Sequence, residues 1–300
     1  MKSFGLENTV LSNTHSLFLL LKQHFPLILT QNWEMLPLSG LSGGSYLLQS
    51  QQMDNPIRLI ARTEGKTQSA LYVDRRKEAS ILRQLHNCPF VPKVIGHNSQ
   101  WLLLDWCDGQ HPDPTTFVSE NFQSHLAKTI AQLHCSPLLG YRLQLRDEIA
   151  HYGGFIDVKR FSPRWKRLHH HFLFATMPKT LKLAPAHMDI HAKNIVSSKT
   201  GTLMLLDWEY AANTDIAFSL ETYFQFNHLT DKQRQFFLTQ YCDIAGAYRN
   251  KQQLNHHCKL WAPWVKYMTL MWYEVQWNES HLPHFLLSSQ SLRQYFGLLA

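Results

Sequence analysis

The sequence predicts an α+β protein with two lobes: a small N-terminal lobe built on an antiparallel sheet, and a larger, mainly helical C-terminal lobe. Three observations support this fold class. The chain has 300 residues, and single hydrophobic cores stop growing at about 250–300 residues. Strand-like runs between turn residues precede Cys107, whereas apolar residues at helical spacing dominate after it. We therefore predict lobes at residues 1–107 and 108–300.

The first lobe is expected to contain three strands, one main helix and two further strands. The turns between the first three strands are the glycine-rich segment LSGGSY and the segment Asp54-Asn55-Pro56. The predicted strands are Trp33–Leu38, Tyr46–Gln49, Arg58–Arg62, Val91–Ile95 and Trp101–Trp106, with the helix at Asp74–His86.

A polar, turn-rich segment from Asp108 to Pro114 is expected to connect the lobes. Helices follow it. One carries Leu126, Ile130, Leu133 and His134 at helical spacing, a second begins at a Thr230/Gln233 capping box and covers Asp231–Tyr241, and a third covers Lys259–Trp277.

The composition limits the classes of protein that the chain can belong to. Hydrophobic residues make up 44% and charged residues 17%, which is typical of a folded protein with a sizeable core. The net charge of +7 comes from scattered basic residues, so we expect a basic surface rather than a nucleic-acid partner. Five cysteines without a CxxC pair indicate neither a disulfide framework nor a zinc knuckle. The apolar run Leu17–Leu21 is too short to cross a bilayer, and we expect a cytoplasmic protein without a membrane partner.

The segment from His187 to Ala211, HMDIHAKNIVSSKTGTLMLLDWEYA, carries the residues that suggest chemistry. Two apolar runs surround residues 199–202, which predicts a hairpin with a four-residue loop. If Ser198 pairs with Leu203, Asn194 falls opposite Asp207. A carboxamide oxygen beside a carboxylate suits Mg²⁺, and Asp189 is then free to accept a proton from a substrate hydroxyl. Each residue alone is more often a turn or cap residue, but the three together favour phosphoryl transfer to an alcohol.

The same segment of sequence resembles a known family. HMDIHAKN followed by LLDWEYA is similar to the H-x-D-x-x-x-x-N and D-W-E motifs of the aminoglycoside phosphotransferase and choline kinase family, whose members are relatives of protein kinases. With LSGGSY and DIAFSLE added, the text looks most like that of bacterial thiamine kinases. The resemblance covers roughly Leu38–Glu221 and implies a protein kinase-like fold, ATP and Mg²⁺, and a small cationic alcohol such as thiamine as the acceptor.

The resemblance also implies roles for individual residues. Asp189 becomes the catalytic base, and Asn194 and Asp207 become the ligands of Mg²⁺. Arg62 stands where protein kinases carry a lysine, and a guanidinium retains the ability to bind phosphate. Glu78 is its candidate partner, although a solvated helix residue is an equal alternative. The residues implied around ATP are Gly40, Ser42, Gly43, Gly44, Ser45, Arg62, Glu78, Asp105 and Cys107.

Five further residues are weaker candidates. His187 and His191 are expected to brace the catalytic loop, although His191 is also a candidate contact to the transferred phosphoryl group. Asp215 is interpreted first as a helix N-cap and second as a site residue. Trp208 and Glu209 are candidate contacts to the thiazolium ring, against the usual position of a tryptophan in the core.

Other functions remain open at this point. Choline or ethanolamine is an alternative acceptor, as is the substrate of another kinase of this family. A zinc-dependent hydrolase using His187-x-Asp189-x-His191 ranks lower, because it leaves the predicted pairing of Asn194 with Asp207 unexplained. A nucleotide-binding module without activity is disfavoured by the presence of all three polar residues. The sequence predicts neither the oligomeric state nor a role for His169-His170-His171.

Overall fold

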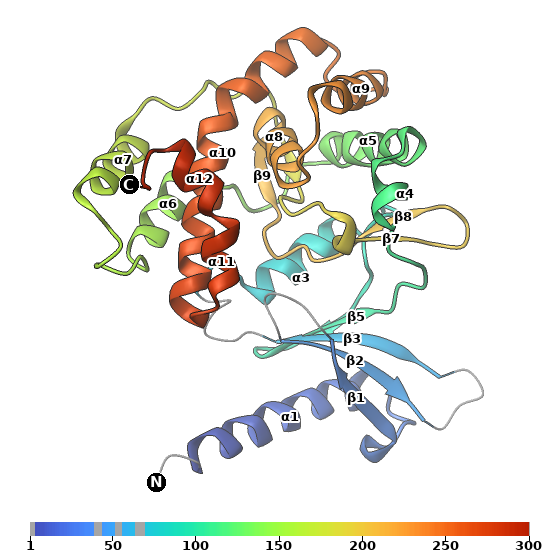
Figure 1. Ribbon diagram of the computed structural model, residues 1–300. Helices are drawn as coiled ribbons and strands as arrows, with labels where there is room; N and C mark the ends of the chain where they lie inside the picture. Colours follow the sequence, from blue (N-terminus) through green and yellow to red (C-terminus); the bar gives the residue numbers. More distant parts are fainter. Residues whose placement is uncertain (1–3, 39–43, 52–55, 64–69, 300) are drawn as a thin grey trace. The chain divides into compact units, whose positions relative to one another are not determined.

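The computed structural model in Figure 1 describes residues 4–38, 44–51, 56–63 and 70–299. The chain divides into two compact units. The N-terminal unit lies within Met1–Ser69, Val73–Gln110 and Val196–Glu209, and the C-terminal unit lies within Ala70–Tyr72, His111–Ile195 and Tyr210–Ala300. The late segment Val196–Glu209 thus groups with the N-terminal strands. The boundary at residue 107 stays a prediction.

A five-stranded antiparallel sheet forms the centre of the N-terminal unit. Its order is β1-β2-β3-β5-β4, and every neighbouring pair is antiparallel. The predicted number and order of strands are confirmed, although β4 begins three residues later than predicted. The strands are β1 (Trp33–Pro37), β2 (Ser45–Ser50), β3 (Arg58–Thr63), β4 (Val94–His97) and β5 (Trp101–Asp105).

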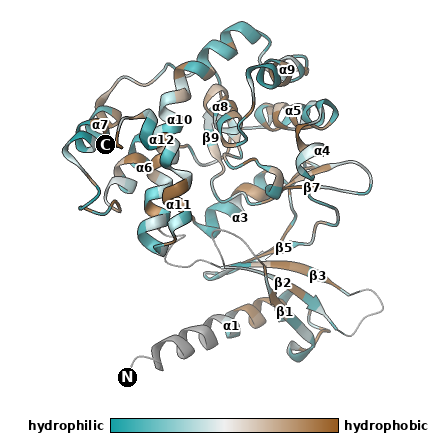
Figure 2. Cartoon of the chain, in the orientation of Figure 1, coloured by the Kyte–Doolittle hydropathy of each residue, from teal (hydrophilic) through white to brown (hydrophobic). Residues whose placement is uncertain are grey.

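Two α-helices of the described residues accompany this sheet. Helix α1 (Phe4–His24) contributes Leu17, Leu20 and Leu21 to a buried cluster with the sheet residues Trp33, Leu48, Leu59, Ala61, Trp101 and Leu103. Much of β2 and β3 is hydrophobic, as the brown colour of these strands in Figure 2 shows. Helix α3 (Arg75–Gln84) begins where predicted, because the Asp74 carboxylate accepts hydrogen bonds from two backbone N–H groups of its first turn. A short 3₁₀ helix, η1 (Thr30–Asn32), precedes β1.

The C-terminal unit is mainly helical, as predicted. The capping box of α9 is present with both of its hydrogen-bonding halves, and α10 is the long helix rich in Trp and Tyr, with Pro263 in its interior. The helices are α4 (Pro114–Val118), α5 (Glu120–Cys135), α6 (Leu145–Gly153), α7 (Pro163–Phe174), α8 (Ile216–Phe226), α9 (Asp231–Cys242), α10 (Lys251–Ser280), α11 (Pro283–Ser288) and α12 (Gln290–Tyr295). None of the helices described by the structure has an apolar stretch long enough to cross a membrane.

Two small sheets complete the fold. Strand β6 (Leu183–Ala186) pairs antiparallel with β9 (Ala212–Asp215), and this pair was not predicted. Strands β7 (Ile195–Ser197) and β8 (Leu203–Leu205) form the other sheet, at the position of the predicted hairpin. The 3₁₀ helix η2 (Ala192–Asn194) leads into β7.

The turn of this hairpin differs from the prediction. The Ser198 N–H donates to the Thr202 carbonyl at 2.9 Å, and the Gly201 N–H donates to the Ser198 carbonyl at 3.0 Å. The loop therefore has three residues, and Gly201 takes the left-handed conformation (φ +82°) that closes such a turn. The predicted register, with Ser198 opposite Leu203, is wrong by one residue. The ladder also ends before Asp207, so strand pairing does not place Asn194 opposite Asp207.

Candidate active site

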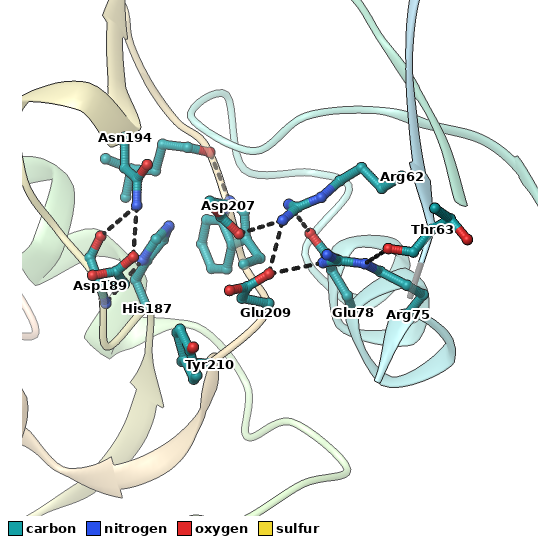
Figure 3. A network of polar contacts seen from close by, with 12 residues as sticks. Arg62, Thr63, Arg75, Glu78, His187, Asp189, Asn194, Asp207, Glu209 and Tyr210 are labelled. Carbon is teal, nitrogen blue, oxygen red and sulfur yellow. Dashed lines mark hydrogen bonds and ion pairs between the residues drawn. The ribbon is translucent and has the colours of Figure 1, made fainter. Parts of the chain in front are cut away.

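The loop after β6 holds Asp189 through short-range contacts. The Asn194 side-chain amide donates to the Asp189 backbone carbonyl at 3.0 Å and to its carboxylate at 2.8 Å (Figure 3). The Asp189 N–H donates to Nδ1 of the buried His187 at 3.3 Å. Met188 between them has φ +70°, a conformation that non-glycine residues adopt mainly where surrounding contacts impose it.

His191 lies beside the same carboxylate. Its Nε2 is 3.6 Å from an Asp189 carboxylate oxygen, and about a third of its side chain is exposed. Asp189 retains 20% side-chain exposure, so its carboxylate is accessible while its loop is fixed from both sides. This arrangement suits a proton acceptor. The bracing roles of His187 and His191 stay predictions.

A second cluster of charges lies within the N-terminal unit. Arg62 on β3 donates to Glu78 on α3 at 2.6 Å, to Asp207 at 2.5 Å and to Glu209 at 2.9 Å (Figure 3). Glu78 is therefore a buried ion-pair partner, and the alternative of a solvated helix residue is wrong. Arg75, in the first turn of α3, also donates to Glu78 (2.7 Å) and Glu209 (3.0 Å). We did not predict Arg75 from the sequence.

Burial and charge act against each other in this cluster. Burial by itself lowers the pKa of Arg62. The negative charges of Asp207, Glu78 and Glu209 outweigh this effect, so the pKa of Arg62 lies above its ordinary value. Burial, with the negative charge of Asp207, raises the pKa of the Glu209 carboxyl above its ordinary value, and Arg62 and Arg75 oppose this increase. We assign Glu209 the ionised form, because one of its oxygens accepts hydrogen bonds from two guanidinium groups within 3.0 Å.

Asp207 is the exposed member of this cluster. Its side chain is 27% exposed, against 5% or less for Arg62, Glu78 and Glu209. Its backbone has φ +63°. Trp208 is buried and donates through Nε1 to the Leu205 carbonyl at 2.6 Å. Trp208 and Glu209 thus have partners inside the protein, and a substrate contact by either stays a prediction.

The residues predicted around the nucleotide are only partly described. Gly40, Ser42 and Gly43 lie outside the described residues. Gly44 has φ +72° and accepts a backbone hydrogen bond from Thr63, immediately before Ser45 opens β2.

Two further members of that predicted set follow β5. Asp105 ends the strand, and its carboxylate accepts the Trp106 N–H at 3.0 Å. Burial raises the pKa of the Cys107 thiol to about 11, so Cys107 is a neutral thiol at physiological pH. Binding of ATP by these residues stays a prediction.

Asp215 is the N-cap of α8, as its first interpretation predicted. Its carboxylate accepts hydrogen bonds from the backbone N–H groups of Ala217 (3.1 Å) and Leu181 (3.0 Å) and from the Trp261 indole (2.8 Å). These three donors give the carboxylate a structural function within the C-terminal unit.

The consecutive histidines lie on α7, where His169 contacts the Tyr267 hydroxyl at 2.9 Å. In the part of the chain that the structure describes, no three or more His, Cys, Asp or Glu side chains are arranged to hold a metal ion.

The sequence matches the family described as "Phosphotransferase enzyme family" over residues 36–254. The chain belongs to this phosphotransferase family. Thiamine kinase from Escherichia coli O81 (strain ED1a) is 32% identical over 257 residues, which cover 85% of this chain and 88% of that enzyme. The predicted family membership and resemblance are confirmed. Membership in a phosphotransferase family excludes the alternative of a zinc-dependent hydrolase.

Solved structures of other kinases share the fold. Choline kinase LicA from Streptococcus pneumoniae has a TM-score of 0.73 at 15% identity, covering 94% of this chain and 99% of LicA. LicA in complex with AMP has a TM-score of 0.69 at 16% identity, covering 92% and 96%. The predicted α+β, protein kinase-like fold is confirmed. The chain is a kinase that phosphorylates an alcohol group, with ATP as the donor.

Proposed function

We propose that the chain phosphorylates the primary alcohol of thiamine, using ATP and Mg²⁺, to give thiamine monophosphate. One observation supports this acceptor above all: the similarity to thiamine kinases, which covers 85% of this chain. Choline is the second candidate, because choline kinase LicA has the same fold, but its 15% identity supports the fold alone.

In the proposed reaction Asp189 accepts the proton of the substrate hydroxyl as that oxygen attacks the γ-phosphorus of ATP. The bond from the γ-phosphorus to the bridging oxygen breaks, and ADP leaves. The contacts of Asp189 support this role, because the Asn194 amide holds its carboxylate, His187 accepts its backbone N–H, and the carboxylate stays partly exposed. General base catalysis of this kind contributes about 10²–10⁴-fold to the rate.

The Mg²⁺ ligands that we propose are Asp207 and the carboxamide oxygen of Asn194. Both are hard oxygen donors, which Mg²⁺ prefers, and Asp207 is the accessible carboxylate of its cluster. The amide nitrogen of Asn194 is engaged by Asp189, which orients its oxygen as the ligand. When bound, Mg²⁺ neutralises the phosphate charge that develops during transfer. Arg62, whose charge is fixed, is the proposed contact to the phosphates.

The test is a substrate comparison with a matched pair of variants. Purified protein is incubated with ATP and Mg²⁺ and with thiamine, choline or ethanolamine, and ADP and the phosphorylated product are quantified. We expect turnover of thiamine. Asp189→Asn keeps an acceptor for the Asn194 amide and is expected to reduce kcat by about 10²–10⁴-fold. Asp243→Asn removes a carboxylate from the exposed C-cap of α9 and serves as the control.

Two outcomes contradict the proposal. Turnover of choline or ethanolamine without turnover of thiamine overturns the acceptor. Wild-type kcat in a folded Asp189→Asn variant overturns the role of the base. Asp207→Ala is expected to weaken ATP binding and its dependence on Mg²⁺, whereas the Asp243→Asn control is expected to leave both unchanged.

A further inference from the structure

Four buried side chains of the N-terminal unit form a closed cycle of ion pairs, which we call the charge cycle: Arg62, Glu78, Arg75 and Glu209. Arg62 pairs with Glu78 at 2.6 Å, Glu78 with Arg75 at 2.7 Å, Arg75 with Glu209 at 3.0 Å, and Glu209 with Arg62 at 2.9 Å. Positive and negative groups alternate around the cycle. Each side chain is 5% exposed or less.

The charge cycle is neutral when both glutamates are ionised, since two guanidinium groups balance two carboxylates. Asp207 lies outside the cycle and joins it through one nitrogen of Arg62. The cluster of five residues therefore carries one net negative charge, and that charge is on its exposed member. An exposed carboxylate beside a neutral buried group is a favourable position for a metal ligand, because the burial cost of the other charges is already offset.

Arg75 is the residue that makes this balance possible. Without it, Arg62 is, among the ion pairs of the described residues, the cation that remains for Glu78, Glu209 and Asp207. A carboxylate left buried without a partner is strongly unfavourable. Arg62 is then needed to neutralise the two glutamates and is no longer free to engage Asp207 or a phosphate.

The position of Arg75 fits this interpretation. It precedes Glu78 by three residues on α3, so the two side chains lie on one face of the helix. Its Nε–H also faces the carbonyl of Thr63, the residue after Arg62, at 3.4 Å. Arg75 thus links α3 to the end of β3 as well as to Glu209.

We propose that Arg75 is a positioning residue of the nucleotide site: it balances Glu78 and Glu209, so that Nη2 of Arg62, which Glu209 shares, keeps its bond to Asp207 and its charge for the phosphates. This inference rests on the proposed nucleotide-binding role of Arg62. It extends that role to a residue outside the sequence motifs.

The test measures binding of ATP–Mg²⁺ without acceptor, by calorimetry, together with the steady-state constants. Arg75→Gln is expected to raise the Kd of ATP by about tenfold or more, which equals about 1.4 kcal/mol, and to leave the KM of thiamine unchanged. Arg76→Gln is the matched control, because it removes the same charge from the next, exposed position of α3. It is expected to leave the Kd within about twofold, the range of a solvated surface charge.

A double variant separates charge balance from the loss of a side chain. Arg75→Gln combined with Glu209→Gln restores a neutral group, Arg62 with Glu78. It is expected to bind ATP more tightly than Arg75→Gln alone, although two residues are changed. Arg75→Lys keeps the charge without the fork of donors and is expected to lie between wild type and Arg75→Gln. If Arg75→Gln alone does not fold, recovery of folding in the double variant supports the same balance.

Equal ATP affinity in Arg75→Gln and Arg76→Gln overturns this inference, as does a double variant that is as weak as, or weaker than, the single one. A double variant that stays unfolded like Arg75→Gln also contradicts it. These outcomes are distinct from failure of the proposed function, which appears in the wild type as absence of ATP binding or of thiamine turnover.

Discussion

His134 on α5 is a buried histidine that predicts how stability depends on pH. Its ring nitrogens contact the Tyr241 hydroxyl at 2.9 Å and the Ser219 hydroxyl at 3.2 Å. Burial lowers the pKa of His134 to about 3, and the positive charge of Lys182 acts in the same direction. The folded protein therefore holds a neutral imidazole at every pH near neutrality.

The sign of the effect follows from the two states. Below pH 6.5, the ordinary pKa of histidine, the unfolded chain binds a proton that the folded protein does not bind. The contribution of His134 to stability is thus complete above pH 6.5 and is lost as the pH falls from 6.5 toward 3. Each pH unit in this window is worth about 1.4 kcal/mol. Between pH 7 and pH 5 the loss due to this residue is about 2 kcal/mol.

The measurement is urea unfolding, followed by circular dichroism, at pH 7 and at pH 5. His134→Gln lowers stability at both pH values because it disturbs two hydrogen bonds, but it removes the titrating group. We expect the difference in unfolding free energy between the two pH values to be about 2 kcal/mol smaller in His134→Gln than in wild type. His171→Gln, on the exposed side of α7, is the control and is expected to keep the wild-type difference. An unchanged difference in His134→Gln refutes the argument.

Three further predictions concern residues of the C-terminal unit. Asp215→Ala removes the acceptor of three hydrogen bonds and is expected to destabilise the fold by about 3 kcal/mol with the KM of ATP unchanged. A large increase in that KM in the folded variant argues for a direct site role. Glu274→Gln weakens a two-bond ion pair with Arg160 (2.8 and 2.9 Å) and is expected to cost about 3 kcal/mol with the KM of thiamine unchanged. An increased KM identifies Glu274 as a charge partner of the acceptor. Asn194→Ala is expected to lower kcat/KM less than Asp189→Asn, and the reverse order in the kinetic assay contradicts the assigned roles.

Elements with local signals were predictable from the sequence. The start of α9 follows from Thr230 and Gln233, because each side chain accepts the backbone N–H of the other residue. The start of α3 follows from its N-cap, Asp74. Helix α1 has no comparable signal. Its apolar residues Leu17, Leu20 and Leu21 become interpretable only once the sheet that covers them is known, because burial against a distant surface is not encoded in local spacing.

Local contacts of the candidate site were predictable, whereas its non-local pairing was not. Asp189 and Asn194 are five residues apart, and their contact lies within one loop, so the motif alone was enough to select both. The pairing of Asn194 with Asp207 rested on a register that failed, because Gly201 shortens the turn by one residue. A single residue in a hairpin loop changes every pair along its ladder.

The charge cycle was not predicted from the sequence, because the arginine at position 62 was interpreted only as a phosphate-binding group with Glu78 as its partner. The sequence shows an arginine where protein kinases have a lysine, and we read this as a change of one phosphate-binding group for another. A lysine is a compact charge, whereas an arginine presents several N–H donors spread over a planar group. In this protein the Arg62 guanidinium donates to Glu209 as well as to Glu78. A second buried carboxylate requires a second cation, which is Arg75. The buried arginine at position 75 therefore balances the second carboxylate that pairs with the arginine at position 62.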